Sequence, residues 1–195
     1  MELAASALAE VRPEPPIGTL LPDPHELLQA LQAVRNGDFS TRLPTDQTGL
    51  AGKQEVCGLV SKALQDEEFI AKHLDPDQCK PRKVLYEDPE LGFCVCGHVY
   101  EKPAHGSPHD HGSSWAIYGV AVGDTEMTDW RIVQPGSGEA PSLVVPEKTY
   151  VMKPGDSHFY DVGVVHSPKR DTLTKLIRIE GANLDRVKRS NIKAK

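Results

Sequence analysis

The stretch AHGSPHDHGSSWAIYGVAVG, residues 104–123, places two histidines two positions apart just before an apolar run. In an extended strand, residues two apart point to the same face, so His109 and His111 would direct two imidazoles into one space. Imidazole is the commonest metal ligand among protein side chains. A third histidine, His166, lies near the end of a second turn-rich strand pattern, KPGDSHFYDVGVVHSP, residues 153–168. Two neighbouring ligands and one distant ligand predict a metal site that is assembled on a sheet.

The strand character continues on both sides of this stretch. From about Lys83 the chain consists of short runs rich in Val, Ile, Tyr, Phe and Trp, which are separated by Gly, Pro, Asp or Ser. The expected strands are residues 84–88, 92–101, 113–122, 124–133, 142–146, 147–153, 157–162 and 172–181. Strands at this spacing predict an all-β sandwich or barrel, with jelly-roll closure among the candidates.

The N-terminal part of the chain has a different pattern. It begins with a proline-rich segment of little periodicity, which predicts a flexible arm. One helix is expected to start at Asp23, and a second to run from about Lys53 to Leu74. The connector between them, GDFSTRLPTDQTGLAGK, resembles that of bacterial HAMP signalling modules over this short segment only. The expected division is an arm at 1–22, a helical extension at 23–80 and a barrel at 81–190.

The charge of the chain argues against a nucleic-acid partner. Lys and Arg number 22 and Asp and Glu 28, which gives a formal net charge of −6. Nucleic-acid binding normally leaves a basic footprint. Basic residues gather only near the C-terminus, where we interpret them as a solvated tail: Arg186, Lys188, Arg189, Lys193 and Lys195.

The sequence also predicts neither a membrane partner nor an oxidising environment. No apolar run approaches the ~18 residues of a membrane span. The N-terminal residues include Glu2 and Glu10 and lack the basic start of a signal peptide, so we expect a cytoplasmic protein. The chain has 4 cysteines, which are too few and too unevenly spaced for a disulfide framework.

Other side chains could support a metal site without binding the metal. His98 lies on the preceding strand, on the same face as Cys96, where it would line the barrel interior. His105 and His158 could fix the tautomer of a ligand. Cys94 and Cys96 also share a face, and two interpretations stay open: a metal-binding pair, or two small buried hydrophobic residues.

The motifs resemble those of the cupin superfamily. The HxH pair, followed by a glycine at the end of the next strand, Gly123, is similar to the first cupin motif. Pro154 and Gly155, followed by a turn and a further histidine, are similar to the second. The resemblance covers roughly residues 83–185. It implies a mainly β fold, the cupin double-stranded β-helix or jelly-roll barrel, here with an N-terminal helical extension and a divalent metal inside the barrel.

One departure from the common cupin pattern narrows the resemblance. Many cupins carry a metal-binding acid a few residues after the second histidine, where this chain has Trp115 and Ala116. In this respect the chain resembles the three-histidine branch of cysteine dioxygenase and 3-mercaptopropionate dioxygenase. The stretches HDHGSSWAIYGVAVG and PGDSHFYDVGVVHSPKRDTLTKLIRIEGAN are similar to that branch as well. The resemblance implies His109, His111 and His166 as metal ligands.

Two positions depart from that branch, whose members place a His and a Tyr two residues apart on the last core strand. Arg178 and Glu180 stand at the matching positions. Arg178 could bind a substrate carboxylate through its planar fork, or it could pair with Glu180 or another nearby acid. Tyr118 and Tyr160 are candidate catalytic residues in the pocket wall, although aromatic residues on strands are also ordinary core.

Three neutral imidazoles leave positions open on a metal, unlike closed four-ligand structural sites. With Fe(II), such a site can bind substrate and O₂ together, and a thiolate would supply the negative charge that the missing acid does not. We therefore expect a thiol-dioxygenase-like oxidoreductase that acts on a small thiol or small organic acid, as a monomer or homodimer. The alternatives are a metal-binding cupin with other chemistry, such as isomerisation or hydrolysis with Zn, Mn or Ni, and a non-catalytic sensor module.

Overall fold

A computed structural model of the chain describes residues 50–79, 81–89 and 91–195. Its helices are Leu50–Ala63 (α2), Glu67–His73 (α3) and Pro76–Cys79 (α4). Its strands are Lys83–Glu87 (β1), Cys94–Tyr100 (β2), Ala104–His105 (β3), Ala116–Val122 (β4), Thr125–Gln134 (β5), Ser142–Met152 (β6), Ser157–Tyr160 (β7), Val165–Arg170 (β8), Thr174–Glu180 (β9) and Ile192–Ala194 (β10). The arm expected at 1–22 and the helix expected to start at Asp23 lie outside the described residues.

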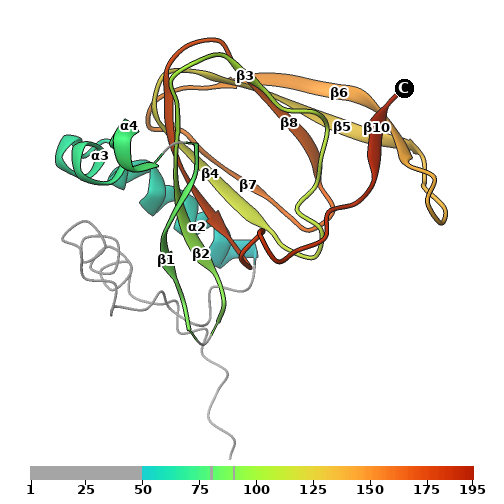
Figure 1. The fold of residues 1–195 in the computed structure, drawn as a ribbon, viewed down its shortest axis with the longest axis horizontal. Coiled ribbons are helices and arrows are strands. Elements are labelled where there is room, and N and C mark those ends of the chain that lie inside the picture. The colour runs from blue at the N-terminus through green and yellow to red at the C-terminus, as the bar shows by residue number, and fades with distance from the viewer. Residues whose placement is uncertain (1–49, 80, 90) are drawn as a thin grey trace, which may run out of the picture.

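The strands form two five-stranded sheets that curl around a shared interior (Figure 1). The strand order is β1-β2-β9-β4-β7 in the first sheet and β10-β6-β5-β8-β3 in the second. Strand β9 comes late in the chain but lies between β2 and β4, and it pairs antiparallel with both. This topology confirms the expected mainly β fold, a jelly-roll barrel of the double-stranded β-helix type with helices on its N-terminal side.

The first sheet is buried on both faces. Helices α2, α3 and α4 lie against its outer face (Figure 1). Aliphatic residues of β2, β4 and β9 pack against these helices: Val95, Val99, Ile117, Ile177 and Ile179. Successive residues of a strand point to opposite faces, so the residues between them face the barrel interior. Several of those inward residues carry polar groups: His98, Tyr118, Arg178 and Glu180. The fold therefore places an apolar face under the helices and a mixed face, with most of the buried polar groups of the sheet, around the interior.

The long helix expected from Lys53 to Leu74 is wrong, because the structure divides it. Helix α2 ends at Ala63 and α3 begins at Glu67. The side chain of Asp66 accepts hydrogen bonds from the backbone N–H groups of Glu68 and Phe69, at 3.0 and 3.1 Å. Asp at this position caps a new helix and competes with continuation of the preceding one.

The strand prediction is also wrong at several places in the second sheet. The two strands expected at 142–146 and 147–153 are the single strand β6, which continues through Pro146 at a register shift opposite Trp130. An irregularity of this kind is where a strand tolerates proline. Strand β8, which contains Pro168, was not among the expected strands. The short strands β3 and β10 were not predicted either, and β10 pairs with β6 beyond the limit expected at residue 190.

Two glycines, one within β4 and one directly after it, permit close approaches of neighbouring groups. Gly119 faces α2, and a Cβ there would lie 2.4 Å from side-chain atoms of both Val60 and Leu64. Gly123 has a φ of 74°, and a Cβ there would lie 2.2 Å from the carbonyl oxygen of Leu173. Positive φ is readily adopted by glycine alone. Gly123, the glycine of the first motif, is therefore required by its backbone conformation and by the nearby carbonyl oxygen.

We expect Gly119→Ala to lower the free energy of unfolding by about 1–3 kcal/mol, because the added methyl group overpacks the contact with α2. Gly58→Ala is the matched control. Among the described residues, nothing lies within 4 Å of a Cβ added at Gly58, on the exposed side of α2. There the helix preference of alanine should raise the free energy of unfolding by about 0.5–1 kcal/mol. Urea unfolding measures both, and a Gly119→Ala protein of unchanged stability would contradict the packing of α2 on β4.

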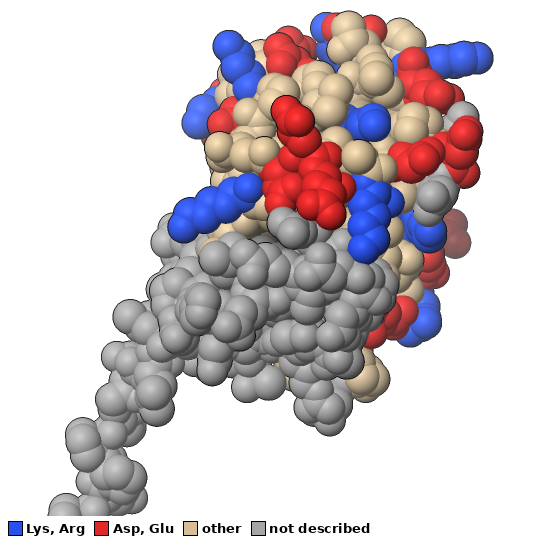
Figure 2. Space-filling view, turned by 90° about the vertical axis from the view of Figure 1, so that its left-hand side faces the viewer, with Lys and Arg blue, Asp and Glu red and all other residues tan. Residues whose placement is uncertain are grey.

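Charged side chains of both signs occur on the face shown in Figure 2, where a group of acidic residues lies between basic ones. That face has no continuous basic surface among the residues that the structure describes. None of the described helices is long and apolar enough to cross a membrane. The absence of nucleic-acid and membrane partners stays a prediction.

Candidate metal centre

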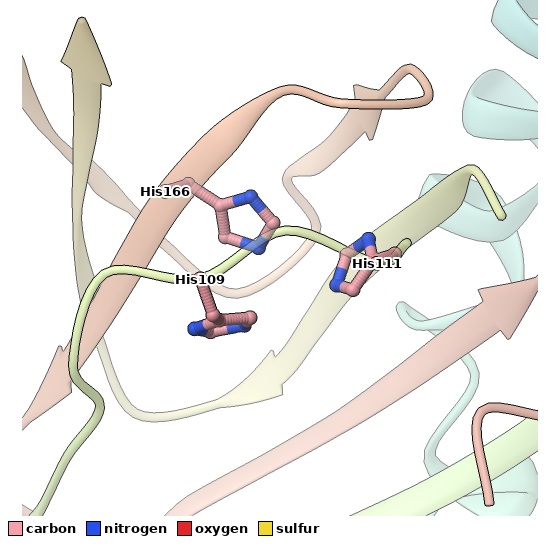
Figure 3. A group of neighbouring side chains, drawn as sticks. All are labelled: His109, His111 and His166. Carbon is pink, nitrogen blue, oxygen red and sulfur yellow. The ribbon is translucent and has the colours of Figure 1, made fainter. Parts of the chain in front are cut away.

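Three histidines from two distant parts of the chain converge inside the barrel, with their rings turned toward one another (Figure 3). His166 lies on β8, and its backbone exchanges two hydrogen bonds with His109, of 2.9 and 3.0 Å. His111 follows in the connection that leads to β4. Candidate ligand nitrogens of the three residues all lie within 4.8 Å of one another. The HxH pair is therefore in an extended connection rather than in the expected strand, yet both imidazoles reach the same space.

Hydrogen bonding leaves nitrogens of this cluster available to a metal ion. Nδ1 of His109 lies 2.8 Å from the carbonyl oxygen of Ser107, so a proton there can be donated to it and Nε2 keeps its lone pair. Nε2 of His111 lies 3.2 Å from the Tyr118 hydroxyl, whereas its Nδ1 has no partner. Neither ring nitrogen of His166 has a hydrogen-bond partner among the described residues. Unpartnered buried polar atoms are costly, and a bound ion would remove that cost.

Burial lowers the pKa of all three imidazoles. The pKa of His111 falls to about 3 through burial and the positive charge of Arg178. The pKa of His166 falls to about 2 through burial and its two histidine neighbours. Burial also lowers the pKa of His109, and the Ser107 carbonyl opposes that shift. Neutral imidazole is the form that binds metal, so the cluster fits a divalent transition-metal ion.

Both candidate tyrosines lie beside the histidines, in different roles. The Tyr118 hydroxyl accepts a hydrogen bond of 3.3 Å from Arg178, and its ring centroid lies 5.6 Å from that of His166. Tyr160 stacks on the His166 ring at a centroid distance of 4.0 Å. Its hydroxyl shares a 2.6 Å hydrogen bond with the hydroxyl of Tyr150. The Tyr118 hydroxyl therefore lies next to a histidine of the cluster, whereas the Tyr160 ring packs against the ring of His166.

Arg178 forms the ion pair with Glu180 that the sequence left open as an alternative to substrate binding. Its Nε donates to Oε1 of Glu180 at 2.7 Å, and its Nη2 contacts the same oxygen. Glu180 is fully buried, and its Oε2 accepts from Arg82 at 3.0 Å and from the Leu184 N–H at 3.1 Å. With a further bond to Tyr118, the guanidinium of Arg178 is held in place by protein groups.

A cavity of about 490 Å³ lies beside the cluster. His109, Tyr118 and Arg178 contribute to its wall. Sequence reasoning missed other lining side chains: Arg82, Tyr100, Arg170, Leu176 and Arg189. No carboxylate side chain of the described residues lines it, so the wall is cationic. One signal could have revealed Arg170, because residues 166, 168 and 170 alternate along β8 and share a face.

Three other histidines of the described barrel, His98, His105 and His158, are not part of the cluster. His98 is buried, lines the cavity and places its Nδ1 3.2 Å from the Tyr100 hydroxyl, which agrees with the expected position inside the barrel. His105 pairs with Asp171 at 2.8 Å on the surface. His158 makes ring contacts with two tyrosines rather than with a member of the cluster. Among the described residues, neither His105 nor His158 makes a contact that could fix the tautomer of a cluster histidine.

The cysteine pair and the tryptophan of the motif belong to the packed interior. Burial raises the pKa of Cys94 to about 11 and that of Cys96 to about 12, so both thiols are protonated at neutral pH. This favours the interpretation of the pair as small buried hydrophobic residues. Trp115 packs against the core under the helices, with its ring centroid 6.4 Å from that of Phe159.

Comparisons with known proteins give low similarities. No protein-family model matches the chain, and no curated protein matches it. Among solved structures, KdgF from Halomonas sp. is 17% identical, with 51% of this chain and 76% of that chain covered and a TM-score of 0.38. A cupin-2 domain protein from Shewanella frigidimarina is 14% identical, with coverages of 50% and 76% and a TM-score of 0.36. The DMSP lyase DddQ from Ruegeria pomeroyi is 14% identical, with coverages of 53% and 47% and a TM-score of 0.39. At this level of similarity, the chemistry has to rest on the site's own residues.

We expect Glu180→Gln to lower the free energy of unfolding by about 3–5 kcal/mol, because it leaves the buried Arg178 without a counter-charge and Arg82 with the exposed Asp185 alone. Glu87→Gln is the matched control, since Glu87 pairs with Arg186, which is 72% exposed. An exposed pair contributes about 1 kcal/mol or less. Urea unfolding of the two variants should separate them clearly, and equal losses would mean that the Glu180 pairing is not structural.

The metal-free protein should lose stability as the pH falls. Unfolded histidines take up protons near pH 6.5, whereas His111 and His166 stay neutral in the folded state down to about pH 3 and about pH 2. The unfolded state therefore binds more protons in this window, and each residue should remove about 1.4 kcal/mol per pH unit below its unfolded pKa. Urea unfolding in chelator from about pH 7 to about pH 4.5 measures the slope. The slope should decrease in His166→Leu and persist in the exposed-site control His105→Gln; a flat profile in the wild type would refute the neutral cluster.

Proposed function

We propose that the protein is a metal-dependent oxidoreductase, a non-haem Fe(II) dioxygenase that acts on a small thiol or small organic acid. The observation that supports this most is the convergence of three neutral imidazoles, with buried unpartnered nitrogens on two of them, beside a cavity of about 490 Å³. His109, His111 and His166 would hold the ion. The cavity has the size of a small-molecule site.

The donor set decides what kind of ion and chemistry the site can carry. Three nitrogen ligands without an acid leave positions open, which is typical of catalytic rather than structural metal sites. Fe(II) held there would bind an organic substrate and dioxygen side by side. Zn, Mn and Ni accept imidazole as well, so the identity of the ion has to be measured.

The protein's own side chains would prepare the substrate. The Ser107 carbonyl fixes the His109 tautomer, so that Nε2 faces the cluster. The Tyr118 hydroxyl lies between Arg178 and His111, where it can exchange a proton with a group bound in the cavity. The cationic wall lowers the energy of a thiolate or carboxylate relative to its neutral form. These features favour an anionic substrate over a neutral one.

Metal analysis of protein purified without added metal, combined with oxygen consumption in the presence of a panel of small thiols, tests this proposal. We expect iron and thiol-dependent oxygen uptake. His109→Ala should lose both, because it removes one of three ligands, while His105→Ala, at an exposed histidine of the cavity wall outside the cluster, should keep the metal. Zinc or nickel without oxygen uptake would contradict the dioxygenase and favour other metal chemistry. Unchanged metal content in His109→Ala would contradict the ligand assignment, and a metal-free protein that binds small molecules would favour a sensor module.

A further inference from the structure

Two of the three candidate ligands lie on a connection that the sheets hold at one point. The backbone of His109 pairs with that of His166, but residues 110–115, which include His111, belong to no strand. Backbone outside a sheet has to find its partners in neighbouring loops and side chains. The directions of the two imidazoles therefore depend on the contacts that hold this connection in place.

The C-terminal segment, residues 181–195, makes such contacts. It joins the two sheets, from the end of β9 in the first to β10 in the second (Figure 1). At its start, the N–H of Gly181 donates to the carbonyl oxygen of Trp115, and the N–H of Ala182 donates to Oγ of Ser114, both at 3.0 Å. At its end, β10 pairs in parallel with β6. The segment is therefore fixed at both ends.

The middle of the segment packs directly on the connection. A Cβ at Gly112 would lie 2.4 Å from the carbonyl oxygen of Lys188 and 2.8 Å from a side-chain carbon of Val187. Gly112 also has a φ of 60°, which glycine adopts readily. The glycine directly after the HxH pair therefore makes room for the C-terminal segment.

Asp110, the residue between the two histidines, binds the segment through its carboxylate. The buried side chain accepts two hydrogen bonds from Ser190, from the backbone N–H at 3.1 Å and from Oγ at 2.5 Å. Its Oδ1 also accepts from the N–H of Gly112 at 3.0 Å. Hydrogen bonds to a carboxylate are roughly twice as strong as those between neutral groups. Neighbouring residues of an extended chain point to opposite sides, so an anchor at Asp110 holds the imidazoles on either side of it toward the cluster.

We propose that Asp110 is a positioning residue of the metal centre. By binding Ser190 it fixes the HxH connection, so that the C-terminal segment sets the affinity of the three histidines for their ion. This inference rests on the metal-binding part of the proposed function and does not depend on the dioxygenase reaction.

The coupling between the ion and the segment acts in both directions. If the docked segment raises the affinity for the ion, a bound ion must hold the segment in place to the same extent. Arg189 belongs to this segment and lines the cavity. Metal binding therefore also stabilises this part of the cavity wall.

A purely structural role of Asp110 would have a different consequence, and Asp88 provides the comparison. Asp88 is a buried acid in the turn between β1 and β2. Like Asp110, it accepts from a backbone N–H and from a hydroxyl, those of Leu91 at 2.7 Å and Tyr86 at 2.9 Å. Loss of either carboxylate should destabilise the fold, but only Asp110 lies between candidate ligands. The two residues therefore separate metal affinity from stability.

Titration of chelator-treated protein with Zn²⁺, against a coloured competing chelator, tests the proposal, since Zn²⁺ binds imidazole and has no redox chemistry. Asp110→Ala should bind Zn²⁺ about 10- to 100-fold more weakly than the wild type, the range typical for loss of a group that orients metal ligands. Ser190→Ala changes an exposed residue outside the motif and should weaken binding by about three- to tenfold, because the Ser190 N–H still donates.

Two further variants show whether these losses arise from the contact itself. The double variant of Asp110→Ala and Ser190→Ala should bind Zn²⁺ little more weakly than Asp110→Ala, because both changes remove the same contact. Asp88→Ala should lower the midpoint of thermal unfolding about as much as Asp110→Ala, yet bind Zn²⁺ within about twofold of the wild type.

Hydrogen exchange measures the reverse direction of the coupling. In the wild type, Zn²⁺ should slow the exchange of amides in residues 186–194, including the N–H of Ser190. In Asp110→Ala it should leave their exchange unchanged. Residues 88–93, in the turn between β1 and β2, serve as the internal reference and should exchange at the same rate with and without Zn²⁺.

The outcomes distinguish this inference from the function on which it rests. Equal Zn²⁺ affinities of the wild type, Asp110→Ala and Ser190→Ala would overturn the inference and leave the metal centre standing. An affinity that falls as much in Asp88→Ala as in Asp110→Ala would show a general effect of stability and overturn it too. A wild type that binds Zn²⁺ no better than His109→Ala would overturn both. Asp110-dependent Zn²⁺ binding in a protein without thiol-dependent oxygen uptake would refute the dioxygenase and support the positioning role.

Discussion

Polar groups inside this barrel have to find their partners there, because helices cover the outer face of the first sheet and the second sheet closes the interior. Glu180 shows how strict this constraint is. It is fully buried, and both of its oxygens are engaged, by Arg178 on one side and Arg82 on the other. Because buried polar groups such as these are paired, the few polar atoms without a partner among the described residues indicate where a ligand could bind. They include both ring nitrogens of His166 and Nε of Arg170. Arg170 lines the cavity, and so does His109, whose backbone pairs with that of His166.

Most of the first sheet could be predicted from the sequence because its strands are rich in β-branched and aromatic residues. The outward positions of these strands are aliphatic and the inward ones polar, since the helices rather than solvent cover the outer face. The helices were less accessible to prediction. Apolar spacing continues across Asp66, and only its capping contacts with Glu68 and Phe69 divide α2 from α3. Strand β8 escaped prediction because Pro168 argues against a strand, although its carbonyl is used by the Gly106 N–H at 2.8 Å.

The histidines and the arginines of the candidate site also differ in how far they could be predicted from the sequence. His109, His111 and His166 could be singled out because their spacing and flanking turns form a pattern along the chain. The pairing of Arg178 with Glu180 could be named only as one of two alternatives, since a sequence does not tell which charges lose contact with water. Arg170 was missed because it belongs to a strand that was not predicted, although the alternation of residues 166, 168 and 170 could have placed it on the same face as His166. The cationic character of the cavity wall also depends on the absence of an acid among its described residues, which only the three-dimensional arrangement reveals.

The central claim is that one metal ion is bound by three histidines at the wall of a cationic cavity. Anomalous diffraction from crystals of the protein, recorded on both sides of the absorption edge of the metal found by elemental analysis, tests it most directly. The account predicts a single peak about 2.0–2.2 Å from one ring nitrogen of each of His109, His111 and His166. A peak at Cys94 and Cys96, or no peak at the histidines in protein that contains metal, would contradict it.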